Sequence, residues 1–151
     1  MAAAKPAARK ERRLLTPETH VEGFRLARAV RRVELVEDYV ELIADLIDAG
    51  GEARQVDIAA RLGVAQPTVA RMLARMAEDG LVDKEPYRGV FLTPEGRRLA
   101  EESRDRHQVV EACLLAIGVP AATARKDAEG IEHHVSRETL ETMRRWLAQQ
   151  G

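Results

Sequence analysis

A segment near the middle of the chain constrains the fold more than any other part of the sequence. Two short helical patterns, at residues 55–62 and 66–79, are separated by Gly63 and a tight turn. Two runs with strand character follow, at residues 81–84 and 89–92, and a short turn joins them. This order predicts a helix-turn-helix that is followed by a β-hairpin wing.

The second helix of such a motif enters the major groove of DNA with its N-terminal turns. Exposed residues early in that helix are therefore placed to meet bases or phosphates, and an arginine at the wing tip is placed to meet a phosphate or the minor groove. The candidate DNA-binding residues are Gln66, Thr68, Arg71, Arg75 and Arg88. Two alternatives stay open at this point: a purely structural helix-turn-helix, and an ordinary exposed loop residue at the wing tip.

The rest of the chain has helical patterns. Only 3% of the residues are aromatic and 32% are charged, which is typical of a mostly helical protein. The patterns predict one long or once-broken helix at about 17–49, a helix from 94 to about 107, an apolar segment at 109–117, and helices near 120–133 and 136–149. We expect a mainly α fold with a small β-wing.

This pattern suggests a division of the chain into three parts. We expect a disordered basic arm at residues 1–15, a winged helix-turn-helix domain with an N-terminal helical extension at 16–95, and a helical domain at 96–151. No apolar run is long enough for a membrane span or resembles a secretory signal, so we expect a cytoplasmic protein with no membrane partner. We expect the single cysteine, Cys113, to be a small buried residue and not a reactive thiol.

The formal net charge of −1 conceals an uneven distribution along the chain. Residues 1–33 carry nine bases and three acids, whereas residues 34–53 carry seven acids and no base. A basic segment therefore precedes an acidic helix. The net charge alone would argue against a nucleic-acid partner, but the basic segment is compatible with one.

Carboxylates and imidazoles recur at helical spacing in two places. Asp38 and Glu41 share one helix face, and Glu129, Glu132 and His133 share another, while His107 ends an intervening helix. Helical bundles build two-metal sites from such groups, although acids on a helix are also common as a solvated face. Two divalent ions would balance the four carboxylates. The lack of sulfur ligands favours manganese but leaves iron(II), cobalt and zinc open.

Several stretches resemble the manganese-responsive branch of the diphtheria-toxin-repressor family. They are EDYVELI at 37–43, VAQPTVA at 64–70, YRGVFLT at 87–93, RDRH at 104–107, DAEGIEHH at 127–134 and, in the extension, HVEGFR at 20–25. The resemblance covers roughly residues 17 to 145. It implies a binuclear Mn²⁺ site with two ions per chain, and its ligands would be Asp38, Glu41, His107, Glu129, Glu132 and His133.

The resemblance also implies a homodimer that binds double-stranded operator DNA, with residues 96–151 as its metal-binding and dimerisation domain. We expect a manganese-dependent repressor of manganese uptake, or an activator of efflux, with no enzymatic activity. The dimer seam would lie at the apolar run 109–117, which alternatively forms simple core. An iron(II)- or zinc-responsive repressor of the same family remains an alternative. So does a metal-independent winged-helix repressor, which leaves the carboxylate–histidine set unexplained, and a metallohydrolase, which leaves the wing without a role.

Overall fold

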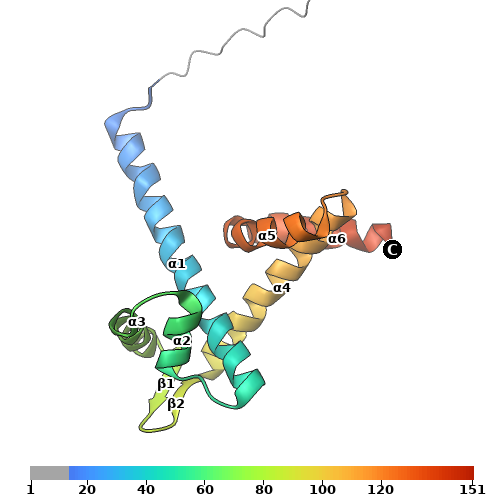
Figure 1. The fold of residues 1–151 in the computed structure, drawn as a ribbon. Helices are drawn as coiled ribbons and strands as arrows, with labels where there is room; N and C mark the ends of the chain where they lie inside the picture. The colour runs from blue at the N-terminus through green and yellow to red at the C-terminus, as the bar shows by residue number, and fades with distance from the viewer. Residues whose placement is uncertain (1–13) are drawn as a thin grey trace, which may run out of the picture.

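The structure, a computed structural model, describes residues 14–151, so most of the arm expected at residues 1–15 lies outside the described part. The described chain is mainly helical (Figure 1). Its elements, in order, are α1 (Pro17–Gly50), α2 (Gln55–Leu62), α3 (Gln66–Glu78), β1 (Val82–Glu85), β2 (Gly89–Leu92), α4 (Pro94–Ala116), α5 (Ala121–Ile131), the short 3-10 helix η1 (Glu132–His134) and α6 (Arg137–Gln150).

Local sequence explains where the long helices begin. The Thr16 hydroxyl accepts a hydrogen bond from the Thr19 amide at 3.3 Å, and Pro17 occupies the first turn of α1. Thr93 caps α4 in the same way, with the Gly96 amide 3.1 Å from its hydroxyl. The helix α1 ends at Gly50 and is capped by Gly51, whose φ of 82° lies in the left-handed region that favours glycine.

Two long helices set the shape of the molecule. α1 runs unbroken, and it diverges from α4 so that the two form a V that opens away from the wing (Figure 1). The sequence predicted separate segments at 94–107 and 109–117, and this division is wrong. α4 is one helix because neither glycine nor proline occurs between residues 97 and 117 to interrupt it. The base of the V carries α2, α3 and the wing, and the far end of α4 carries α5 and α6.

The base of the V has its own apolar core, which α1 shares with α2, α3, the wing and the start of α4. Val40, Ile43, Ile58, Val69 and Leu73 are fully buried in it. Strands β1 and β2 pair antiparallel, with Val82 opposite Leu92. The helix-turn-helix, the wing and the mainly α fold class are thereby confirmed.

A smaller core lies at the other end of α4. Val109, Val110 and Cys113 are buried there, and α5 contributes the small side chains of Ala124 and Ala128. The apolar run predicted as a dimer seam is therefore divided: its first half is core of the same chain, whereas Ile117 is 66% exposed. Among residues 14–151 no helix combines the length and the apolar character that crossing a membrane requires.

Candidate metal centre and nucleic-acid interface

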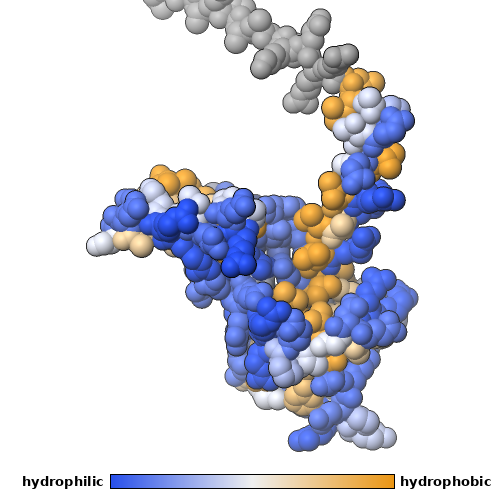
Figure 2. Space-filling view, turned by 180° about the vertical axis from the view of Figure 1, so that it is seen from behind, coloured by the Kyte–Doolittle hydropathy of each residue, from blue (hydrophilic) through white to orange (hydrophobic). Residues whose placement is uncertain are grey.

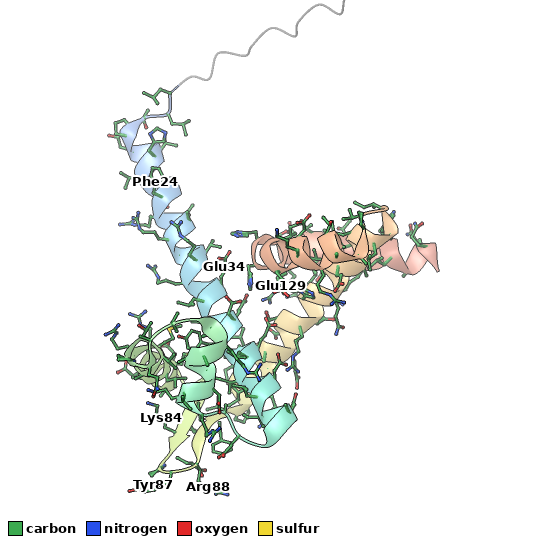
Figure 3. All side chains as sticks on the ribbon, in the orientation of Figure 1. Phe24, Glu34, Lys84, Tyr87, Arg88 and Glu129 are labelled. Carbon is green, nitrogen blue, oxygen red and sulfur yellow. The ribbon has the colours of Figure 1, made fainter. Side chains whose placement is uncertain are left out.

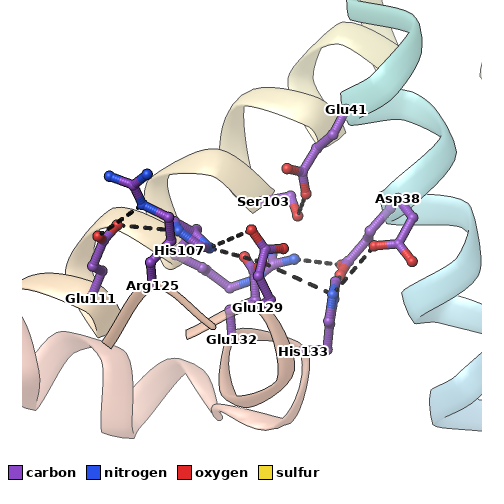
Figure 4. Close-up of polar contacts among 11 residues, drawn as sticks. Asp38, Glu41, Ser103, His107, Glu111, Arg125, Glu129, Glu132 and His133 are labelled. Atoms are coloured by element: carbon purple, nitrogen blue, oxygen red, sulfur yellow. Dashed lines mark hydrogen bonds and ion pairs between the residues drawn. The ribbon is translucent and has the colours of Figure 1, made fainter. Parts of the chain in front are cut away.

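The candidate metal ligands lie close together where α1, α4 and the junction between α5 and η1 meet (Figure 4). α1 contributes Asp38 and Glu41, and α4 contributes His107. Glu129 lies near the end of α5. The sequence predicted that this last helix continues to about His133, but the chain changes to the tighter turn of η1 at Glu132.

Three of the six candidates form the tightest group. Nδ1 of His107 lies 3.3 Å from Oε1 of Glu132 and 3.8 Å from Oε1 of Glu129. One potential ligand atom from each of these side chains lies within 4.8 Å of the others. Glu132 is almost fully buried, and its second oxygen, Oε2, has no hydrogen-bond partner among the described residues. A buried carboxylate oxygen without a hydrogen-bond partner is suited to bind a cation.

The other three candidates surround this group. Nε2 of His133 lies 3.5 Å from Oδ1 of Asp38 and 4.0 Å from Oε1 of Glu132, so His133 links α1 to the buried acid. Glu41 accepts a hydrogen bond from the Ser103 hydroxyl on α4. The structure thus brings all six predicted residues to one region, while their role as ligands stays a prediction.

A second layer of charged residues was missed by the sequence reasoning. Oε2 of Glu37 lies 2.7 Å from Nδ1 of His133, and its Oε1 pairs with the Arg106 guanidinium at 2.5 Å. Oε2 of Glu111 lies 3.2 Å from Nε2 of His107, and Oε1 of Glu111 is 3.7 Å from Arg125. Each histidine therefore has one nitrogen beside a candidate ligand and the other beside a carboxylate, which is how proteins orient metal-binding imidazoles.

A sequence signal for Glu37 did exist. It occupies the apolar face of α1, next to Val36 and three residues before the buried Val40, and only 6% of it is exposed. An acid on a buried face needs a partner, so its position indicates a paired carboxylate. The partner itself, His133, lies 96 residues away and is not visible in any local pattern.

Burial, and secondarily the crowding of acids, raises several pKa values at this site. Burial, together with the nearby Glu41 carboxylate, raises the pKa of Glu132 to about 7. Burial likewise raises the pKa values of Asp38 and Glu41. Burial alone lowers the pKa of His133, but the hydrogen bond with Glu37 and the surrounding acids outweigh it and raise that pKa. The site therefore holds protons that a divalent cation would replace.

The candidate DNA-binding residues lie on α3 and at the tip of the wing. Gln66, Thr68, Arg71 and Arg75 of α3 are all exposed, whereas Val69 and Leu73 are buried, as the sequence predicted. Figure 3 places Tyr87 and Arg88 at the tip of the wing, far from Glu34 and Glu129, which lie where α1 and α5 approach each other. Arg88 pairs with Glu85 of the same hairpin at 3.4 Å. Their contact with DNA stays a prediction.

Comparison with known proteins assigns the family. The sequence model of the N-terminal DNA-binding domain of iron dependent repressors matches residues 32–90, and that of their metal-binding and dimerisation domain matches residues 93–149. The chain belongs to the iron-dependent repressor family. Membership confirms the resemblance to the diphtheria-toxin-repressor family, and the chain is a DNA-binding transcriptional regulator of that family.

Individual relatives agree with this assignment. The chain is 59% identical over 149 residues to the transcriptional regulator MntR of Escherichia coli O157:H7, covering 99% of this chain and 96% of the relative. It is 58% identical to MntR of Salmonella typhimurium, with 99% and 95% covered. A solved manganese-dependent transcriptional repressor in complex with manganese superposes with a TM-score of 0.64 at 29% identity. The match covers 74% of this chain but only 52% of that longer one.

Proposed function

We propose that the chain is a manganese(II)-dependent repressor that controls manganese homeostasis in the cytoplasm, binding two ions per chain through Asp38, Glu41, His107, Glu129, Glu132 and His133. The observation that carries this proposal is the buried Glu132, whose Oε2 is unpaired beside His107 and Glu129. The donor set is made of oxygen and nitrogen without sulfur, which suits manganese. The manganese regulators among its relatives support the same choice.

The candidate ligands connect the two halves of the molecule. Asp38 and Glu41 belong to α1, whose second half is part of the DNA-binding core, whereas His107, Glu129, Glu132 and His133 belong to the other half. A bound divalent cation supplies positive charge that neutralises these acids. The side chains of α1 can then be held against η1, which fixes the angle between the two halves.

The second half of the chain would form the dimer. An apolar groove of about 360 Å³ lies between α4 and α6, and Leu114, Ile117, Met143 and Trp146 line it. A second copy that covers this groove would place two α3 helices at a defined separation. That separation must match successive major grooves, so metal-dependent rigidity would raise operator affinity. We place the boundary between the two parts near residues 95 and 96, in the first turn of α4.

Fluorescence anisotropy with a metal panel tests the proposal. An operator duplex, obtained by selection from a random pool with the Mn²⁺-loaded protein, is titrated with the protein in chelator or in Mn²⁺, Fe²⁺, Co²⁺ or Zn²⁺. We expect Mn²⁺ to raise the affinity about 100-fold, which corresponds to a coupling of about 2.7 kcal/mol. Equal affinity with chelator and with saturating Mn²⁺ would contradict metal dependence. A larger response to Fe²⁺ or Zn²⁺ would favour the iron(II)- or zinc-responsive alternative.

A further inference from the structure

The first half of α1 lies outside the region that the family's DNA-binding domain model matches. The family match begins at residue 32, but α1 begins at Pro17, so residues 17–31 form a helical extension that projects from the base of the V (Figure 1). At 1.5 Å per residue this extension is roughly 22 Å long. Most of its side chains are exposed, including Phe24, which is 62% exposed.

The end of the extension nearest the base carries a cluster of arginines. Arg25, Arg28 and Arg31 belong to it and Arg32 directly follows it, and residues 23–33 contain no acid, whereas Glu18 and Glu22 lie earlier in the extension. Among residues 14–151 none of these four guanidinium groups has a carboxylate within 4 Å, whereas arginines elsewhere, such as Arg98 and Arg144, are paired with acids. An unpaired row of arginines on a helix is electrostatically complementary to a row of phosphates.

The row faces the same way as the recognition helix. Arg25, Arg28 and Arg32 share one face because they are spaced by three and four residues. Arg32 lines a groove between α1 and α3 together with Met72 and Arg75, which fixes the direction of that face. Figure 2 shows a hydrophobic band that runs down α1 toward the base, with hydrophilic side chains along the outer edge of the helix.

We infer that the extension of α1 is a second DNA contact, in which Arg25, Arg28 and Arg32 bind phosphates of the duplex beside the groove that α3 enters. This inference rests on the proposed function. The contacts would be independent of base sequence and would lengthen the footprint on each side of the operator. Val33 lines the same groove as Arg32, and neither it nor the exposed Leu26 takes part in the phosphate contacts.

The double variant Arg25→Gln/Arg28→Gln tests the inference. Both positions are exposed, and glutamine keeps helix propensity while removing the charge. The metal-loaded, full-length protein is titrated on the selected operator with 15 flanking base pairs per side, at several salt concentrations, and is then footprinted with hydroxyl radicals. Arg137→Gln/Arg145→Gln on α6 removes the same charge elsewhere, and Arg25→Lys/Arg28→Lys keeps the charge.

We expect the glutamine variant to lose protection in the flanks only. The slope of log affinity against log salt should become shallower by about 0.9 for each lost contact, or up to roughly 3.6 for four arginines in a dimer. The α6 variant and the lysine variant should keep the wild-type slope. Suppose that the wild-type protein binds the operator and the glutamine variant keeps the wild-type slope and footprint. That result would overturn this inference and leave the proposed function standing. Failure of the wild-type protein to bind in a metal-dependent way would overturn the proposed function and the inference together.

Sedimentation of the same variants separates DNA binding from contact between copies. We expect the glutamine variant to keep the wild-type mass in the absence of DNA. A changed mass would assign the extension to protein assembly and would overturn the inference.

Discussion

At the scale of single residues, the metal site depends on carboxylates that do not themselves face the candidate ion positions. Glu37 lies between His133 and Arg106, and Glu111 lies between His107 and Arg125. Each carboxylate can accept the proton of one imidazole nitrogen and leave the other nitrogen free to bind metal. The arginines balance the negative charge that these carboxylates add to an already acidic site.

Glu37→Gln should weaken Mn²⁺ binding about 10- to 100-fold, because an amide holds the His133 ring less firmly than a carboxylate does. Isothermal titration calorimetry with Mn²⁺ measures this change. Glu34→Gln is the matched control, since Glu34 lies one turn earlier on α1 and pairs with His134, whose side chain is 60% exposed. Equal losses of Mn²⁺ affinity in the two variants would contradict a positioning role for Glu37.

Glu132→Gln should act in opposite directions on the metal-free and the metal-loaded protein. Without metal, the amide removes a buried acid that is repelled by Glu41, so resistance to urea at pH 7.5 should rise. With Mn²⁺ present, the stabilisation that metal gives the wild-type protein should disappear. Circular dichroism during urea unfolding, with chelator and with Mn²⁺, measures both effects. A variant that Mn²⁺ still stabilises fully would remove Glu132 from the site.

At the scale of elements, the wing is anchored by a close approach of backbones. The Val90 amide donates a hydrogen bond to the Ala53 carbonyl at 2.8 Å, next to Gly89, whose φ is 89°. A Cβ at Gly89 would lie 2.6 Å from the Ala53 oxygen. Only glycine satisfies both the conformation and the space, so the position of the wing relative to α1 depends on this residue.

Gly89→Ala should lower the free energy of unfolding by about 1–3 kcal/mol, because the side chain meets backbone and the conformation is strained. Gly23→Ala should instead raise the free energy of unfolding. Gly23 lies inside α1 with nothing within 4 Å of its Cβ position, so alanine should stabilise the helix by about 0.5–1 kcal/mol. Urea unfolding of both variants measures the difference. A neutral Gly89→Ala variant would show that the wing can shift away from Ala53.

At the scale of the whole molecule, the acids of the site link its protonation to its stability. The pKa values of Asp38, Glu41, Glu132 and His133 are all raised in the folded chain. The folded chain therefore binds more protons than the unfolded one in the window between the usual glutamate pKa of 4.5 and about 7. The free energy of unfolding of the metal-free protein must then fall as the pH rises through that window.

The metal-free protein should accordingly need more urea to unfold at pH 5 than at pH 7.5. Saturating Mn²⁺ should reverse this order, since the metal binds only the deprotonated acids. Urea titrations at several pH values, with chelator or with Mn²⁺, measure both trends. The metal-free protein would contradict the prediction if its stability rose from pH 5 to pH 7.5.

Sequence alone determined the features that short-range geometry encodes. Glycine at the end of a helix, as at Gly63, and apolar spacing predicted the helix-turn-helix and the wing, because these signals act within a few residues. The types of residue in the candidate site were likewise visible as i, i+3 pairs, such as Asp38 with Glu41. The division of α4 was predicted wrongly because the sequence becomes more apolar after residue 108. That change reflects what the helix packs against and does not interrupt the helix.

Only the tertiary structure decided which distant residues meet. Glu37 with His133, Ser103 with Glu41, and Arg32 beside Arg75 come together through the packing of α1 against α3, α4 and η1. No local period records such pairs, because they depend on the angle at which the long helices cross. That angle places the acids of α1 against His133 of η1 and Arg106 of α4, and it places Arg32 beside the recognition helix.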